Sequence, residues 1–364
     1  MKLAERSSRS ERQPGGVRRL PGAVIFCILG LLLFIVILLA VSMGSVAISF
    51  DTIIQILLNG TGLFHFRQVW DPSIEVIIWQ VRMPGVLGAA LVGTGLAIAG
   101  VLFQGILRNP LADPYLLGTS SGAALGAAIA FVLPLSTLYG AFFPLTPVLA
   151  FVGAILSVFL VYSLARTDGR TPIVTLLLAG VVINAVLVAC QTLLLTLIPN
   201  AQFSILALFN WLSGGIAVTN WPPVVVVGII MLLGVVLSLR FAGILDTFAL
   251  GEESAAYLGL PVERYKLLIV IIASLITAAA VSISGLIGFV GLVVPHAMRL
   301  LIGPRHRLLL PASALSGAIF LTVADMLARV ILAPAVLPVG VLTALVGAPF
   351  FLFLLRNSKR AYKW

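Results

Sequence analysis

The sequence predicts an all-α polytopic membrane protein, and three properties of its 364 residues lead to this fold class. Hydrophobic residues make up 61% of the chain and charged residues only 9%, whereas a soluble domain carries about 25% charged residues. The mean hydropathy is +1.19. The net charge of +10 lies in short basic clusters between apolar runs that are long enough to cross a bilayer. A soluble globular domain, a disordered chain and a nucleic-acid-binding protein are thereby excluded.

Apolar runs of about 20 residues, the length that crosses the hydrocarbon layer, recur along the chain. A shorter run, 287–302, contains Pro295 and His296 and decides between nine crossings and ten. Both chain ends are rich in Lys and Arg and therefore prefer the cytoplasm, which requires an even number of crossings. We predict ten spans, at 23–40, 86–106, 116–133, 148–165, 173–198, 224–239, 267–284, 287–302, 308–332 and 337–355.

This topology places all but three of the 22 Lys and Arg residues on the cytoplasmic side. The three exceptions are Arg67, Arg82 and Arg329, at or near the outer side. Residues 1–20 and 357–364 are predicted to be basic cytoplasmic tails. Because the bias is strong, it predicts that both termini are cytoplasmic. We expect the first apolar run to be a span rather than a cleaved signal peptide.

The connection between the first two spans, residues 46–79, is too long for a simple turn. Trp70 and Trp79 follow an amphipathic stretch in it, and tryptophan favours the headgroup level of a membrane. An apolar face on such a stretch favours a helix that lies in the interface. We therefore predict an outer interfacial helix with its apolar face formed by Phe50, Ile53, Ile54, Leu57 and Leu58.

Glycine spacing predicts how the middle spans pack. Three glycines in 118–126 recur every four residues, so they form one stripe on a helix face and let a neighbouring backbone approach closely. Three more in 285–291 recur every three residues just before Pro295, and this spacing predicts a broken or reoriented helix of the kind found along transporter paths. Residues 97–112 also align without gaps to 282–297 with five identities, five spans apart. This predicts a weak inverted repeat.

Asp325 and Arg329 are charged residues inside the ninth span. They stand four residues apart, so they share a helix face and can form an ion pair. Charges at membrane depth are costly and therefore indicate functional residues. An ion pair that simply locks neighbouring helices together is the alternative.

The sequence lacks the motifs for ATP hydrolysis and for a catalytic or metal site. None of the four lysines follows the Gly-x-x-x-x-Gly-Lys-Ser/Thr pattern, so this chain does not itself hydrolyse ATP. The three histidines are scattered, and no cluster predicts a catalytic or metal site. Cys27 and Cys190 lie in apolar runs and are interpreted as small buried hydrophobes. The cytoplasmic connection 241–264 is long and helical in character, which favours a partner-binding element over an ordinary polar loop.

Several strings in the sequence are specific enough to indicate a family. Over about residues 42–355 the chain resembles the FecCD family, the permease subunits of ABC importers for iron–siderophore, haem and cobalamin. The matching strings lie at 82–84, 105–114, 117–123, 257–261, 288–296, 325–329 and 337–350.

The resemblance implies a homodimer of ten-helix subunits, residues 21–356 here, in the bacterial inner membrane around a central path. It implies two ATPase subunits that bind ATP and Mg, and a periplasmic or lipid-anchored substrate-binding protein; this chain itself binds no cofactor. Residues 243–263 resemble the cytoplasmic coupling loop that fits a cleft on the ATPase. Its candidate contacts are Gly251, Ala255, Leu258 and Gly259.

Arg82 and Arg329 match outer-face arginines that pair with acidic residues on the binding protein, with interfacial anchoring as the alternative for Arg82. Asn109 and Leu111 match a cytoplasmic gate between the second and third helices. The opposite gate element, around 172–175, matches less clearly because Pro172 and an isoleucine replace the usual small hydroxyl residues.

The cargo implied by the resemblance is an iron chelate, with haem favoured over a ferric siderophore. Residues 303–307 and the Leu-Pro-Val-Gly segment at 337–340 resemble haem and siderophore permeases more than cobalamin ones. A cobalamin permease of the same family is the alternative. An ion-coupled secondary transporter, which would use Asp325, is the alternative from another class. Membrane lipid is the expected surrounding, and no nucleic acid is expected as a partner.

Overall fold

The computed structural model describes residues 21–361 apart from 45–47, 61, 63, 133–144, 199–201, 217 and 219. The predicted tail 1–20 and residues 362–364 lie outside the described residues. Within the described part every regular element is a helix. In chain order they are α1 (Gly22–Ser42), α2 (Phe50–Gly60), α3 (Pro72–Val76), the π-helix η1 (Ile77–Arg82), α4 (Met83–Ile106), α5 (Thr119–Val132), α6 (Leu145–Ala165), α7 (Ile173–Leu197), α8 (Gln202–Leu212), α9 (Trp221–Arg240), α10 (Ala242–Phe248), α11 (Glu252–Tyr257), α12 (Val262–Ser284), α13 (Val290–Ile302), α14 (His306–Val330) and α15 (Val339–Ala361).

Each of the ten predicted spans coincides with one of these helices, and α2 coincides with the predicted interfacial helix. Seven helical segments are long and apolar enough to cross a membrane, and further apolar helices of 10–17 residues accompany them in the described chain. The all-α polytopic fold class is therefore confirmed. The count of ten crossings and the orientation stay predictions. Helix α15 runs to Ala361, beyond the predicted end of the last span, and α8 was not predicted at all.

The second span begins earlier than predicted. Helix runs without a break from Pro72 to Ile106, through α3, η1 and α4, instead of starting at residue 86. Pro84 lies within this helix although it has no N–H to donate to the helical hydrogen bonds. The helix widens to a π-turn just before it, where the N–H of Met83 bonds to the carbonyl of Ile78, and so continues past the proline.

The break before α13 was correctly predicted, but it does not lie at Pro295, which is inside the helix. The chain leaves α12 at Gly285, whose φ is +63°, and re-enters helix after Phe289, whose φ is +69°. A side chain at Gly285 would collide with the carbonyl oxygen of Trp211. The aligned segments 97–112 and 282–297 therefore differ locally, since the first is helix then loop and the second is helix end, loop and new helix.

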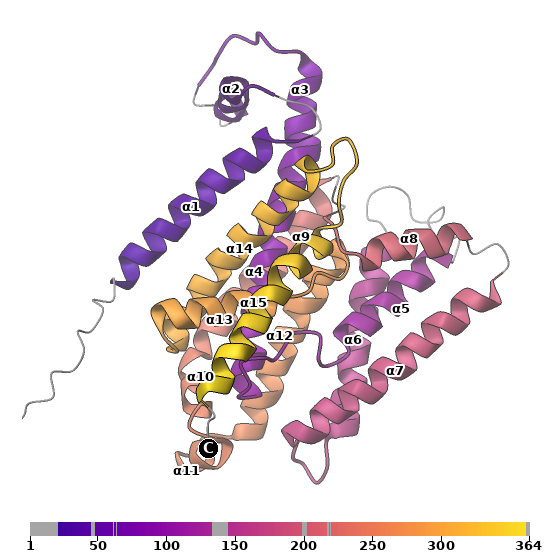
Figure 1. Ribbon diagram of the computed structural model, residues 1–364, viewed down its shortest axis with the longest axis vertical. Coiled ribbons are helices and arrows are strands. Elements are labelled where there is room, and N and C mark those ends of the chain that lie inside the picture. The colour runs from indigo at the N-terminus through magenta and orange to yellow at the C-terminus, as the bar shows by residue number, and fades with distance from the viewer. Residues whose placement is uncertain are drawn as a thin grey trace, which may run out of the picture.

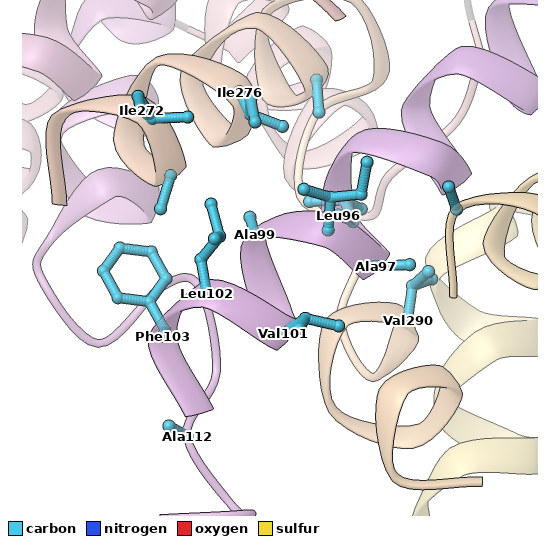
Figure 2. Close-up of a cluster of buried hydrophobic side chains, with 14 of the residues drawn as sticks. Leu96, Ala97, Ala99, Val101, Leu102, Phe103, Ala112, Ile272, Ile276 and Val290 are labelled. Carbon is cyan, nitrogen blue, oxygen red and sulfur yellow. The ribbon is translucent and has the colours of Figure 1, made fainter. Parts of the chain in front are cut away.

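Helix α4 forms the centre of the molecule, between α12, α13 and α14 (Figure 1). Its buried side chains pack against α12 and α13, as Figure 2 shows for Leu96, Phe103, Ile272, Ile276 and Val290. Glycine allows the closest helix contacts. A β-carbon added to Gly93 would collide with the carbonyl oxygen of Gly317 on α14.

The predicted glycine stripe is confirmed for Gly122 and Gly126, whose faces meet the backbone of α6. Gly118 instead lies before α5 with a φ of +79° and serves the turn. The interpretation of Cys27 and Cys190 as buried was wrong, because both are exposed on the outer faces of α1 and α7. An apolar helix face in a membrane protein needs no protein cover, so an apolar run does not predict burial within the protein.

Candidate functional site

Two groups of polar residues lie at opposite ends of the molecule. Helices α10 and α11 lie at one end, and α2 and α3 lie at the other (Figure 1). The first end is called the α11 end below, and the second the α2 end.

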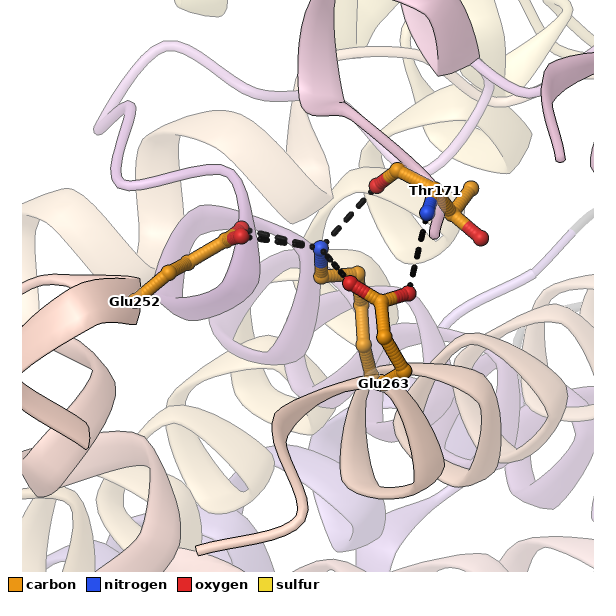
Figure 3. A network of polar contacts seen from close by, with 4 residues as sticks. Thr171, Glu252 and Glu263 are labelled. Carbon is orange, nitrogen blue, oxygen red and sulfur yellow. Dashed lines mark hydrogen bonds and ion pairs between the residues drawn. The ribbon is translucent and has the colours of Figure 1, made fainter. Parts of the chain in front are cut away.

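A buried lysine holds three segments together at the α11 end. Lys266, in the first turns of α12, is only 1% exposed. Its Nζ donates to the carbonyl of Thr171 at 2.9 Å, to Glu263 Oε1 at 3.1 Å and to Glu252 Oε2 at 3.0 Å (Figure 3). Glu263 also accepts the N–H of Thr171 at 3.0 Å. The network therefore joins α11, α12 and the loop between α6 and α7.

That loop is a tight hairpin. Thr167 and Arg170 exchange both backbone hydrogen bonds across Asp168 and Gly169, which both have positive φ. An Asp-Gly pair with positive φ at both positions is the usual sequence of such a turn. Thr171 follows the hairpin directly and precedes Pro172 at the start of α7.

Helix α10 is joined to α14. Asp246 Oδ1 accepts the N–H of His306 at 3.0 Å and lies 2.6 Å from its Nδ1. Since the first N–H groups of a helix have no partner within it, the carboxylate caps α14 and fixes α10 against it. The predicted coupling loop, which contains α10 and α11, is therefore bound to α12 through Glu252 and to α14 through Asp246.

The four predicted coupling residues differ in backbone conformation and in exposure. Gly251 has a φ of +116° and starts α11, and Gly259 has a φ of +82° and ends it. The N–H groups of Gly259 and Leu260 bond back to Ala256 and Ala255, which is a Schellman turn. Ala255 is fully buried and is not available to a partner. Leu258 is 66% exposed.

Sequence reasoning missed the most exposed apolar residue of this element. Tyr257 is 90% exposed, and Leu258, next to it, and Leu250, just before α11, are also exposed. The signal was present, because large apolar side chains in a polar loop indicate a contact surface. We call Leu250, Tyr257 and Leu258 the α11 apolar surface.

The predicted gate residues lie in the loop between α4 and α5. Asn109 Oδ1 accepts the N–H of Leu111 at 2.9 Å, so the asparagine shapes its own turn, and both residues are exposed. Arg108, with a φ of +48°, brings its guanidinium next to Gly251, where an added β-carbon would lie 3.6 Å from Nη1. The gate loop and the coupling element are therefore neighbours.

The same loop is anchored to the break before α13. The hydroxyl of Tyr115 donates to the carbonyl of Ile287 at 3.0 Å and accepts its N–H at 3.2 Å. Asp113 accepts the N–H of Tyr115 at 2.8 Å, and burial of this carboxyl raises its pKa to about 6. Sequence reasoning missed Tyr115 as an anchor because its partner, Ile287, is more than 170 residues away, and it missed Asp113, which holds the backbone of Tyr115.

Arg82 lies at the α2 end but does not face outward. It is 6% exposed, and its Nη1 donates to the carbonyls of Val41 at 2.8 Å and Ser42 at 3.0 Å. Those carbonyls end α1 and have no partner within their helix. Arg82 is therefore buried in this conformation, and its predicted role in docking the binding protein stays a prediction. Arg82 fastens α1 to the long second helix.

Arg329 and Asp325 form the expected ion pair, with 2.9 Å between Nη2 and Oδ2. Both line a cavity of about 890 Å³ where α8, α12 and α14 meet, together with Asn210, Trp211 and Ser282. Arg329 keeps part of its side chain exposed. Of the two predicted docking arginines it is therefore the one that a partner can reach.

The described residues contain no group of three or more metal-ligating side chains. They carry apolar helices, a largely apolar cavity that holds the Asp325–Arg329 ion pair at one end, and a group of loops joined by Lys266 at the other, and this arrangement is that of a multi-pass membrane protein. The sequence model of the FecCD transport family matches residues 32–357. The chain belongs to the FecCD transport family.

Known relatives agree with this assignment. The chain is 44% identical over 287 residues to the cobalamin import system permease protein BtuC of Halobacterium salinarum, covering 79% of this chain and 75% of that protein. It is 38% identical over 346 residues to the hemin transport system permease protein HmuU of Yersinia pestis, covering 91% and 96%. A solved structure described as an inward-facing conformation of a metal-chelate type ABC transporter has 30% identity and a TM-score of 0.78, covering 92% of this chain and 99% of that chain. This chain is accordingly a permease subunit of an ABC transporter.

Proposed function

We propose that this chain is the membrane permease of a binding-protein-dependent importer that carries an iron chelate, haem in the first place, across a bacterial inner membrane. A separate ATPase, which binds ATP and Mg, supplies the energy. The single observation that carries the proposal is the proximity of the gate loop and the coupling element at the α11 end, where Arg108 meets Gly251.

The α11 apolar surface supports a partner at that end. Tyr257 and Leu258 are exposed next to a polar network, so a cleft on a soluble subunit would remove apolar area from water. Glu253 at the start of α11 is exposed and offers a charge for the rim of the same contact, whereas the carboxylate of Glu252 is bound to Lys266. This is the contact we propose for the ATPase, one on each of two permease copies.

A homodimer is proposed on the basis of the family resemblance and of the outer face of α7 and α8. Phe203 and Phe209 on α8 and Leu178 and Val181 on α7 expose large apolar side chains. A second copy facing these helices would enclose an apolar path between the subunits. Weak binding of cargo is expected there, because affinity would reside in the soluble binding protein.

Docking of the binding protein is proposed at Arg329, which is partly exposed at the rim of the cavity. Its pairing with Asp325 fixes the guanidinium in place. The same pairing weakens the alternative of an ion-coupled carrier, since such a carrier needs a carboxylate that is free to take up its ion.

Cobalamin is the second candidate cargo. The observation that favours it is the 44% identity to a protein named as a cobalamin import permease, against 38% to a hemin permease whose match covers more of both chains. Haem is favoured by the match over 91% of this chain and by the segments at 303–307 and 337–340.

Uptake into proteoliposomes tests the proposal. The permease is reconstituted with its cognate ATPase and binding protein, and haem, a ferric siderophore and cobalamin are offered separately. We expect uptake of haem that requires ATP hydrolysis and ignores imposed proton or sodium gradients. ATP-driven uptake of cobalamin alone would overturn the cargo assignment. Uptake that follows an ion gradient without ATP would overturn the whole assignment.

A further inference from the structure

The network around Lys266 is larger than a local salt bridge. It is built from one ammonium group, two carboxylates and both backbone polar groups of a single residue, Thr171 (Figure 3). Glu263 and Lys266 are three residues apart on α12 and share a helix face. Together they hold Thr171 by its N–H and its C=O.

The three joined segments have different tasks in the proposed transport cycle. Glu252 begins α11, the element proposed to meet the ATPase. Thr171 and Pro172 lead from the hairpin into α7, where the family resemblance puts the second gate element. Glu263 and Lys266 begin α12, which runs through the core against α4.

We call the contacts of Lys266 with Glu252, Glu263 and Thr171 the Lys266 joint, and its burial restricts the relative motion of the three segments. The side chain of Lys266 is 2% exposed, whereas those of Glu252 and Glu263 are 36% and 32% exposed. A buried ammonium group is strongly destabilising when it loses its partners. Its three acceptors therefore have to move together with it, while each carboxylate keeps contact with water.

We infer that Lys266 is a positioning residue that makes α11 and the α6–α7 hairpin move as one unit, so that displacement of α11 shifts the start of α7. This inference rests on the proposed function for the meaning of that displacement. The joint itself rests only on the contacts of this chain.

The first test measures the joint in the permease alone. Cys27 and Cys190 are exposed and are first replaced by serine. Spin labels at Arg170→Cys and Glu253→Cys, which are both exposed positions, then report the distance between the hairpin and α11 in nanodiscs. We expect a narrow distance distribution in the parent protein and a broadened one in Lys266→Met and in Glu252→Gln.

Ser274→Ala is the matched control. Ser274 is buried on the same helix, and its hydroxyl has no hydrogen-bond partner among the described residues. The control should keep the narrow distribution. Glu252→Gln removes only a charge at the outer edge of the network, so it tests the joint even if Lys266→Met fails to fold. An unchanged distribution in the Glu252 variant and in any folded Lys266 variant overturns the inference.

The second test measures coupling in the reconstituted complex. The number of cargo molecules taken up per ATP hydrolysed should fall at least about fivefold in Glu252→Gln and Lys266→Met, within the range of typical coupling energies. Hydrolysis itself should be less affected, because the ATPase site is on another chain. A ratio equal to that of the parent protein overturns the coupling role. If the parent complex shows no ATP-driven uptake, the proposed function fails, and the distance measurement still decides whether the joint exists.

Discussion

Truncation of Tyr257 is expected to weaken binding of the ATPase without harming the permease. The side chain is 90% exposed, so it contributes little to the fold. A tyrosine buried in an interface covers about 150 Å² or more. At about 25 cal/mol per Å² this gives an upper bound of about 4 kcal/mol. Ordering of the side chain costs about 0.5–1.5 kcal/mol of this gain. This leaves about 2.5–3.5 kcal/mol, and because alanine keeps the β-carbon in the contact we expect a loss of about 2 kcal/mol for Tyr257→Ala, or a dissociation constant about 30-fold higher.

The assay is equilibrium binding of the purified ATPase subunit to the permease in nanodiscs. Val69→Ala is the control, because Val69 is also largely exposed but lies just before α3 at the α2 end. Its affinity should equal that of the parent protein. Thermal unfolding of Tyr257→Ala should be unchanged, as is usual for exposed positions. An affinity within about threefold of the parent, with a folded permease, would refute the assignment of the α11 apolar surface to the ATPase.

Three further outcomes are expected. Gly93→Ala should lower the free energy of unfolding by about 1–3 kcal/mol, since its β-carbon meets the α14 backbone, whereas Gly30→Ala on open α1 should not; thermal unfolding measures both. Burial raises the pKa of Asp113 to about 6, above its ordinary value of 3.8, so the folded state binds the proton at a higher pH than the unfolded state does. The free energy of unfolding should therefore rise as the pH falls from about 7 to 4. Asp113→Asn should abolish this dependence, which unfolding measured over a series of pH values checks. Arg329→Gln should lower the ratio of binding-protein-stimulated to basal ATP hydrolysis, whereas buried Arg82→Gln should chiefly lower thermal stability; an unaltered ratio in the Arg329 variant contradicts the docking proposal.

Features that depend on neighbouring residues in the sequence were predicted well. All ten apolar runs coincide with helices because hydropathy and length act within one segment. The ion pair of Asp325 and Arg329 followed from their spacing on one helix, and the break before α13 followed from its glycines. The first part of the second span was not predicted, although the helix continues past Pro84 through a local π-turn.

Features that depend on contacts between distant segments could not be predicted. Lys266 and Thr171 are 95 residues apart, and a lysine at the start of a span reads only as a charge that favours the cytoplasm. Arg82 donates to the carbonyls at the end of α1, about 40 residues away in the sequence. No pattern around Arg82 distinguishes an outward-facing arginine from one that turns inward to a carbonyl.

The basic residues therefore have roles that a count of charges does not separate. Buried backbone carbonyl groups at helix ends and in loops have no donor within a helix, and these need a donor from elsewhere in the protein. Arg82 supplies that donor to the last carbonyls of α1, and Lys266 supplies one to the carbonyl of Thr171, in the loop just before α7. In both cases the long side chain joins two segments at the point where the backbone alone leaves a polar group unsatisfied. Substituting either residue should consequently loosen a specific pair of segments, while leaving the membrane orientation to the other Lys and Arg residues.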